Sequence, residues 1–230
     1  MKKKVLMVLT SHGTLGTTGG KTGVWIEEFA NPYYTFIDHG IALTLASLTG
    51  GQPPIDPRST LPEMQTEATK RFHKDPVAQK AFGNTIPISK VKAVDYDSIF
   101  FPGGHGPMWD LAADQTNAKL LSEFYLAGKP IGAVCHGPAA LTKAVDKNGA
   151  SIVKGKRVTG FTNTEEKAVG LDKVVPFLLE EKLRELGGLY SNGADWTSYV
   201  VTDGILVTGQ NPASAGETAK ALIDILSNKK

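Results

Sequence analysis

The chain has 230 residues, of which 41% are hydrophobic and 21% are charged, and this suits one globular domain with a full core. The formal net charge of +2 gives no reason to expect nucleic acid or an acidic lipid surface as a partner. One cysteine excludes an intramolecular disulfide, and no apolar run reaches the length of a membrane span or a signal peptide, so we expect a cytoplasmic protein that does not bind membranes.

Apolar runs of strand length alternate with helical patterns along the chain. Strands are expected at 5–10, 41–48, 96–101, 130–134, 157–160 and 205–208, and helices at 24–38, 62–84, 112–127, 137–145, 176–186 and 213–227. This alternation predicts an α/β fold, with a mostly parallel sheet covered by helices on both faces. We expect a single domain over 1–230 with a small helical insertion around 50–90, and a ligand site in the loops that follow the strands.

Cys135 is the middle residue of the segment 133–137, Ala-Val-Cys-His-Gly, where a buried strand is expected to pass into a helix. The small residues on either side permit a sharp turn that exposes the middle side chain, as in the nucleophile elbow of hydrolases. A helix N-terminus would lower the pKa of this thiol. The backbone N–H of His136 and the turn at Gly103-Gly104 would supply oxyanion donors. Although a lone cysteine is more often a buried structural residue, this pattern favours a catalytic nucleophile.

The segment 16–22, Gly-Thr-Thr-Gly-Gly-Lys-Thr, follows the first predicted strand in the manner of a phosphate-binding loop. That motif requires a glycine five residues before Gly20, where this chain has Leu15, and no apolar strand ends in a magnesium-binding aspartate. We therefore interpret the segment as a loop at the mouth of the site.

The five histidines lie far apart in the sequence and lack the paired spacing of metal ligands, so no metal site is expected. His12 and His105 follow predicted strands and are expected in the wall of the site. Each tryptophan is expected to pack in the fold. Trp196 is also a candidate for substrate selection, because it lies in a loop late in the chain.

Two pairs of adjacent glutamates lie near the expected site. Glu27 and Glu28 begin the helix after the first strand, and Glu165 and Glu166 follow a later strand. A helix start attracts acidic residues for electrostatic reasons alone. Spacing therefore leaves open which member of each pair faces the site.

Several motifs are spread over nearly the whole chain. They are Lys-Thr-Gly-Val at 21–24 with Glu28 and Pro32 after it, Gly-His-Gly at 104–106, the cysteine motif extended to 133–139, Val-Thr-Gly-Phe-Thr at 158–162 and Val-Thr-Gly-Gln-Asn-Pro-Ala-Ser at 207–214. This set resembles the ThiJ/PfpI superfamily. Within it, the closest similarity is to the branch of heat-shock glyoxalase III enzymes and holding chaperones of yeast and bacteria, often labelled class I glutamine amidotransferase-like. The resemblance implies a flavodoxin-like three-layer sandwich.

The resemblance also implies roles for the candidate residues. It makes Cys135, His136 and Glu166 a catalytic triad and places Glu28 in a hydrogen bond with the cysteine. Because Glu165 stands where a relative carries another residue, the choice between Glu165 and Glu166 stays open.

A second group of residues would bind the substrate. The resemblance makes Gly104 an oxyanion donor, and we add His105 and Trp196 as substrate-binding candidates. The zinc-binding additions of some bacterial relatives have no matching residues here. Neither a metal nor a cofactor is therefore expected.

The activity implied by the resemblance is that of a glyoxalase III, which converts methylglyoxal and water to D-lactate through a hemithioacetal on Cys135. The substrate would be a small 2-oxoaldehyde, and the family commonly forms homodimers. Three alternatives stay open: a holding chaperone, a cysteine hydrolase acting on amides, esters or peptides, and a protein deglycase. An accessible low-pKa thiol would also be prone to oxidation, so a redox-sensing role stays open too.

Overall fold

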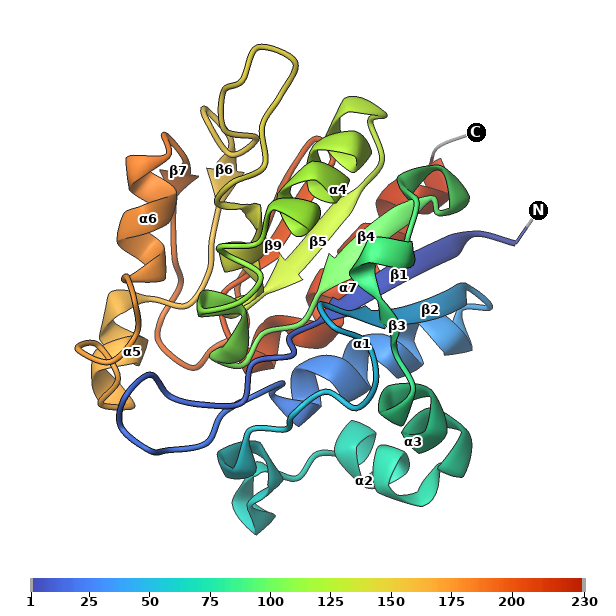
Figure 1. Cartoon of the computed structure of the whole chain (residues 1–230), viewed down its shortest axis with the longest axis vertical. Helices are drawn as coiled ribbons and strands as arrows, with labels where there is room; N and C mark the ends of the chain where they lie inside the picture. Colours follow the sequence, from blue (N-terminus) through green and yellow to red (C-terminus); the bar gives the residue numbers. More distant parts are fainter. Residues whose placement is uncertain (1, 229–230) are drawn as a thin grey trace.

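The computed structural model describes residues 2–228, and its middle layer is a sheet of seven strands (Figure 1). In spatial order the strands are β3 (Ile86–Pro87), β2 (Ala42–Ser47), β1 (Lys4–Leu9), β4 (Ser98–Phe101), β5 (Ile131–Val134), β9 (Leu206–Gly209) and β8 (Val200–Asp203). All neighbouring pairs are parallel except β8 and β9, which are antiparallel. The expected α/β fold with a mostly parallel sheet is confirmed.

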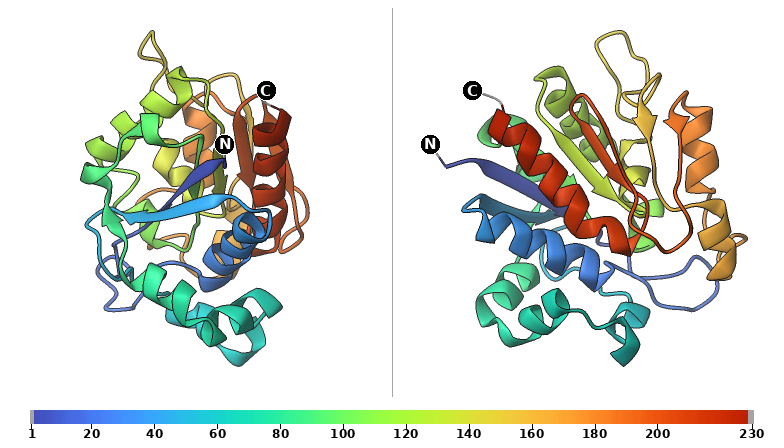
Figure 2. Two further views of the ribbon diagram at one scale, coloured as in Figure 1. Left: turned by 90° about the vertical axis from the view of Figure 1, so that its right-hand side faces the viewer. Right: turned by 180° about the vertical axis from the view of Figure 1, so that it is seen from behind.

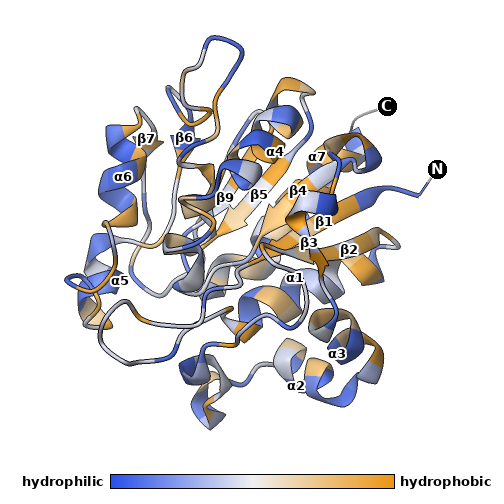
Figure 3. Ribbon diagram, in the orientation of Figure 1, coloured by the Kyte–Doolittle hydropathy of each residue, from blue (hydrophilic) through white to orange (hydrophobic). Residues whose placement is uncertain are grey.

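The apolar strand runs of the sequence occupy the centre of this sheet. In β1, the five residues from Val5 to Leu9 are completely buried, as expected for a parallel strand that is covered on both faces. Figure 3 shows the hydrophobic residues concentrated in the central strands and the hydrophilic ones on the outer sides of the helices.

Seven α-helices surround the sheet. They are α1 (Ile26–Asp38), α2 (Glu67–Lys74), α3 (Pro76–Gly83), α4 (Gln115–Leu126), α5 (Asn163–Ala168), α6 (Leu179–Glu185) and α7 (Ala215–Asn228). Helices α1 and α7 lie side by side on one face of the sheet, and α4 covers the other (Figures 1 and 2). None of the helices in residues 2–228 combines the length and the apolar character needed to cross a membrane.

The segment between β2 and β4 carries the helical part that the sequence predicts at 62–84. It forms two helices instead of one, because Asp75 ends α2 and caps α3 by accepting the N–H groups of Val77 and Ala78. Pro76 at the first position of α3 favours the same break. Helix α2 packs on α1, at the lower edge of Figure 1.

Two predictions at the other side of the sheet are wrong. The helix expected at 137–145 is a single 3-10 helix, η6 (Gly137–Leu141), which has Pro138 in its first turn. The strand expected at 157–160 is β6 (Arg157–Val158), which pairs with β7 (Leu189–Tyr190) in a separate two-stranded sheet. Strand β8 was not expected, although the Asp203-Gly204 dipeptide before β9 is a strong hairpin signal.

Candidate active site

Cys135 follows β5 directly, at the carboxyl end of the sheet, and has a left-handed backbone with φ of 60°. In residues 2–228 the only other non-glycine residue with positive φ is Trp196, at 62°. A Cβ atom at Gly137 would lie 2.3 Å from the carbonyl oxygen of Phe101, so this position requires glycine. The chain thus makes the tight turn predicted from the sequence, at a cost of roughly 1–2 kcal/mol for the strained Cys135 backbone.

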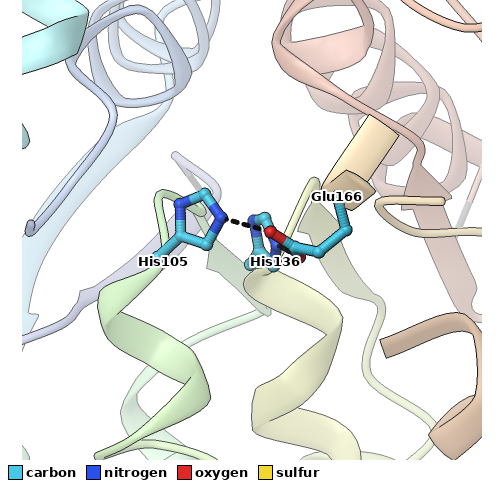
Figure 4. A group of neighbouring side chains, drawn as sticks. All are labelled: His105, His136 and Glu166. Carbon is cyan, nitrogen blue, oxygen red and sulfur yellow. Dashed lines mark hydrogen bonds and ion pairs between the residues drawn. The ribbon is translucent and has the colours of Figure 1, made fainter. Parts of the chain in front are cut away.

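His136 joins the thiol to a carboxylate. Its Nδ1 lies 3.4 Å from Cys135 Sγ, and its Nε2 lies 2.6 Å from Glu166 Oε2. The histidine and the glutamate are almost completely buried. Figure 4 shows the two side chains facing one another, together with His105. Cys135, His136 and Glu166 therefore form a continuous chain of contacts.

His105 is the second histidine on the same carboxylate. Its Nε2 lies 2.8 Å from Glu166 Oε1, and its Nδ1 lies 3.1 Å from Nη2 of Arg58. Arg58 in turn forms an ion pair with the buried Asp56, whose Oδ2 lies 2.6 Å from the guanidinium. A hydrogen-bonded chain thus runs from Asp56 through Arg58 and His105 to Glu166, and its first three residues lie outside the expected triad.

The direction of these hydrogen bonds follows from the donors available. A guanidinium can only donate, so Nδ1 of His105 accepts from Arg58, and its Nε2–H donates to Glu166. Burial, together with the nearby His136 and Arg58, lowers the pKa of His105 to about 4, which keeps this ring neutral at physiological pH. Because Glu166 also accepts the Nε2–H of His136, the Nδ1 lone pair of that histidine faces the thiol.

Glu166 is ionised in this arrangement. Burial opposes its ionisation, but His136 and His105 hold the pKa of this carboxyl well below its usual range. The carboxylate can therefore stabilise a positive charge on His136 when that ring takes up a proton.

Glu28 lies on the other side of the sulfur and is completely buried. Its Oε2 accepts the N–H of Gly103 at 2.8 Å, whereas Oε1 accepts no N–H or O–H bond from the described residues and the carboxyl interacts with the Cys135 thiol. Burial raises the pKa of Glu28 to about 8. A carboxyl that exchanges its proton near neutral pH thus lies beside the candidate nucleophile.

The expected lowering of the Cys135 pKa is wrong for the unliganded site. Burial and the nearby Glu28 raise the pKa of this thiol well above its usual value, although the N–H of Gly104 favours the thiolate. The five-residue η6 has too few aligned peptide dipoles to offset burial. The thiol must therefore lose its proton during the reaction, and Nδ1 of His136 is placed to accept it.

Each glutamate pair divides into one residue at the site and one outside it. Glu27 points away from the sulfur, towards Thr66 and Asn31, which both donate to its carboxylate. The geometry thus selects Glu28 from the first pair.

In the second pair, Glu165 accepts the N–H of Trp196 at 2.8 Å and the side-chain amides of Gln210 and Asn211. Its other oxygen, Oε2, accepts the N–H of Thr162. These donors come from three segments of the chain and none of them is a histidine, so the geometry selects Glu166 as the partner of His136.

A cavity of about 320 Å³ opens over the sulfur. Gly104, His105, Cys135 and His136 contribute to its floor, and its walls include Trp25, Arg58, Leu61, Met64, Phe161 and Trp196. The expectation of packing alone is wrong for Trp25, and Trp196 lies where a residue that selects substrate would lie. Trp109 does pack, since it stacks on His12 outside this cavity.

The structure corrects one expectation about this region and adds one residue to the site. The glycine-rich segment 16–22 contributes no residue to the cavity wall, although Thr22 donates a hydrogen bond to Asp56. Arg58 was not expected at all. The signal for it was its position in the loop after the second strand, since ligand sites of parallel sheets gather in such loops.

His105 and His136 are adjacent in space despite their distance in sequence, with ring centroids 4.0 Å apart. With Glu166 they bring three ligand-type atoms within 4.8 Å of one another, a donor set of two imidazoles and a carboxylate that suits a divalent transition metal. These atoms already hydrogen-bond with one another, so a metal would have to displace those bonds. That the site works without a metal stays a prediction.

The chain is similar to known proteins over almost its entire length. The model of the DJ-1/PfpI family matches residues 22–225. The glutathione-independent glyoxalase HSP31 of Saccharomyces cerevisiae is 34% identical, and the alignment covers 98% of this chain and 99% of that protein. Glyoxalase 3 of Candida albicans is 33% identical, with 96% of this chain and 97% of that protein covered.

Solved structures show the same similarity. The crystal structure of glyoxalase III from Candida albicans superposes with a TM-score of 0.90 at 31% identity, covering 97% of both chains. The Rapid Encystment Protein 24 kDa of Francisella tularensis superposes with a TM-score of 0.93 at 43% identity, covering 97% of this chain and 99% of that one.

Proposed function

The chain belongs to the DJ-1/PfpI family, and we propose that it is a glutathione-independent glyoxalase, which converts methylglyoxal and water to D-lactate without a cofactor. Full-length similarity to relatives named glutathione-independent glyoxalase and glyoxalase 3 supports this activity. The observation that carries the proposal is the buried Glu28 carboxyl against the Cys135 thiol. A simple hydrolase needs the nucleophile, a histidine and its acid, whereas an internal proton transfer needs one more acid–base group at the reacting carbons.

The first step is the addition of the thiol to the aldehyde. Sγ of Cys135 forms a bond to the aldehyde carbon while Nδ1 of His136 takes the thiol proton, and Glu166 stabilises the resulting imidazolium. The carbonyl electron pair moves onto the aldehyde oxygen, which the N–H groups of Gly104 and His136 stabilise. Return of the proton to this oxygen gives a neutral hemithioacetal.

The second step moves hydrogen between the two oxygenated carbons. The Glu28 carboxylate removes the proton from the carbon that bears sulfur, and the electron pair moves to the neighbouring ketone oxygen, which gives an enediolate. His136 passes the proton of the first hydroxyl to this oxygen, and Glu28 returns its proton to the second carbon as the first oxygen regains its double bond to carbon. The product is a lactoyl thioester of Cys135, an isomer of the hemithioacetal, so no external oxidant or reductant is needed.

Hydrolysis completes the cycle. His136 removes a proton from water, and the hydroxide adds to the thioester carbonyl. Collapse of this adduct breaks the carbon–sulfur bond, releases lactate and restores the thiol with the proton held on His136. A neutral His105, held by Arg58, keeps Glu166 oriented towards His136 throughout.

An assay of purified wild type and Cys135→Ala with methylglyoxal, glyoxal and simple esters tests the proposal. We expect wild type to form D-lactate and the variant to lose at least 10³-fold in rate. A loss below tenfold would exclude the cysteine mechanism. Ester hydrolysis without lactate formation would identify a hydrolase, and suppression of client aggregation unchanged in Cys135→Ala would favour the chaperone alternative.

We further propose that the enzyme acts in the cytoplasm and as a homodimer. A reactive lone thiol needs a reducing compartment to stay reduced, which supports the location. The dimer is an expectation from the family resemblance, and sedimentation velocity of the purified protein tests it.

A further inference from the structure

The catalytic cavity adjoins a second cavity of about 530 Å³. The two share part of their walls, since both are lined by Trp25, Met64, Val169, Trp196 and Pro212. A three-carbon aldehyde bonded to Cys135 has no atoms that would extend into this second space. The combined space is thus larger than methylglyoxal requires.

The second cavity has a negatively charged wall. Glu27 and Glu63 line it, and neither lysine nor arginine is among its lining residues in the described part of the chain. In the catalytic cavity the positive charge of Arg58 is balanced by its ion pair with the buried Asp56. The two carboxylates of the second cavity have no such cationic partner among the residues that line it.

Glu27 is the buried member of this wall, with 9% of its surface exposed. Thr66 and Asn31 donate hydrogen bonds to its two oxygens, but within residues 2–228 it has no ion pair with a cationic side chain. Burial raises the pKa of this carboxyl. A buried carboxylate without a cation nearby is costly, and a cationic ligand would offset that cost.

The walls between the two ends are aromatic and apolar. Trp25 and Trp196 line both cavities, and indole rings attract cations as well as apolar groups. The backbone N–H of Trp196 is held by Glu165, so this wall is attached to the fold by a buried hydrogen bond. A ligand that passes between these rings thus meets a preformed surface.

From this arrangement we propose that the second cavity binds the distal end of a larger 2-oxoaldehyde that carries a cationic group. The oxygenated end would react at Cys135, an apolar middle would lie between Trp25 and Trp196, and an ammonium or guanidinium group would lie at Glu27 and Glu63. The reaction of the oxygenated end with Cys135 rests on the proposed glyoxalase activity, whereas the preference for a cationic distal end rests on the second cavity.

A matched pair of substrates tests it. 6-(Trimethylammonio)-2-oxohexanal and 7,7-dimethyl-2-oxooctanal have the same shape and differ only in charge, because four methylene groups separate the end group from the reacting carbonyls. We expect wild type to show about tenfold higher kcat/KM for the cationic compound, and the ratio to fall towards one in Glu63→Gln and in Glu27→Gln. Glu123→Gln, an exposed carboxylate on α4, is the matched control and should keep the wild-type ratio. A wild-type ratio of one or less, or a ratio unchanged in both cavity variants, would overturn the proposal.

Binding of unreactive ketones separates this proposal from the proposed activity. Calorimetry with 4-(trimethylammonio)acetophenone and 4-tert-butylacetophenone needs no turnover. Tighter binding of the cation that depends on Glu63, in a protein that makes no lactate from methylglyoxal, would support the subsite and contradict the glyoxalase activity. Lactate formation from methylglyoxal without tighter binding of the cationic ketone would support the glyoxalase activity and contradict the subsite.

Discussion

Glu165 and Glu166 are adjacent in α5, and their carboxylates serve two different parts of the site. Glu166 accepts hydrogen bonds from His105 and His136, at 2.8 and 2.6 Å. Glu165 accepts the backbone N–H of Trp196 and thereby holds the wall of the cavity. One helical turn thus holds both the two histidines beside Cys135 and the tryptophan in the wall of the cavity.

This division predicts that the variants Glu165→Gln and Glu166→Gln have different defects. Glu166→Gln removes the negative charge and replaces one of the two acceptor oxygens by an NH2 group, which cannot accept, so we expect kcat to fall roughly 10²–10⁴-fold. Glu165→Gln places an amide against the donors Trp196, Gln210 and Asn211 and should cost about 1–3 kcal/mol of stability, with a raised KM. Urea unfolding and steady-state kinetics of both variants check this. Identical defects in the two variants would contradict the division.

Arg58 is expected to act as a positioning residue through His105. Arg58→Met removes the donor to Nδ1 of His105 and a positive charge that lowers its pKa, so the pKa of His105 should rise from about 4 towards its ordinary value of 6.5. A protonated His105 would weaken the basicity of His136 through their shared carboxylate. We therefore expect kcat to fall about tenfold, with an acid limb that becomes steeper below about pH 6.5, where protonation of His105 adds to that of Glu28.

The Arg58 prediction has its own controls. Arg58→Lys keeps the charge and should keep the wild-type slope of the acid limb. Nitrogen-15 NMR should show Nδ1 of His105 unprotonated in wild type and protonated at pH 5 in Arg58→Met. An unchanged acid limb in Arg58→Met would assign Arg58 a structural role only.

The pH dependence of the reaction should reflect Glu28. Because burial raises the pKa of this carboxyl to about 8, it carries a proton at lower pH, and only its ionised form can remove the proton from carbon. We expect kcat/KM for methylglyoxal to rise nearly tenfold per unit up to about pH 8 and then to level off. Glu28→Gln should lose lactate formation. A profile that is flat between pH 6 and 8 would show that Glu28 is not the base.

The same group should make stability fall as pH rises. The folded protein holds a proton on Glu28 between its ordinary pKa of 4.5 and about 8, whereas the unfolded chain does not. The stabilisation is therefore complete below pH 4.5 and is lost as pH rises through about 8, with a slope of at most about 1.4 kcal/mol per pH unit. Urea unfolding between pH 5 and 8.5 should show this slope in wild type, and a smaller one in Glu28→Gln.

The left-handed backbone of Cys135 predicts that a glycine variant at this position is more stable than an alanine variant. Cys135→Ala keeps a Cβ atom at a φ of 60°, whereas Cys135→Gly removes it. We expect both variants to be inactive and Cys135→Gly to be more stable by about 1 kcal/mol, because relief of strain exceeds the extra chain entropy of glycine. Thermal unfolding of the pair measures the difference. A more stable alanine variant would argue against strain at the elbow.

Local patterns were sufficient for five of the seven strands in the described sheet, most helices and the turn at Cys135. Strand runs such as 5–9 are apolar throughout because both faces are covered, and this is readable from neighbouring residues alone. The elbow is equally local, since Gly137 leaves the space that the Phe101 carbonyl occupies. The errors at 137–145 and at β8 arose where a few residues decide between a helical turn, a hairpin and a loop.

Spacing left the choice between neighbouring carboxylates open; the family resemblance implied Glu28 and Glu166, and the tertiary structure supplies the physical reason. Glu27 and Glu28 differ by one position on a helix, and only the packing of α1 under the turn at Gly103 decides which one is buried at the sulfur. The role of Arg58 likewise depends on a loop folding back onto His105 from 47 positions away in the chain. The sequence by itself therefore determined the turn that carries the candidate nucleophile and the scaffold, because both depend on short-range sterics and burial. The proton pathway and its pKa values depend on contacts between distant segments, and only the tertiary structure decided them.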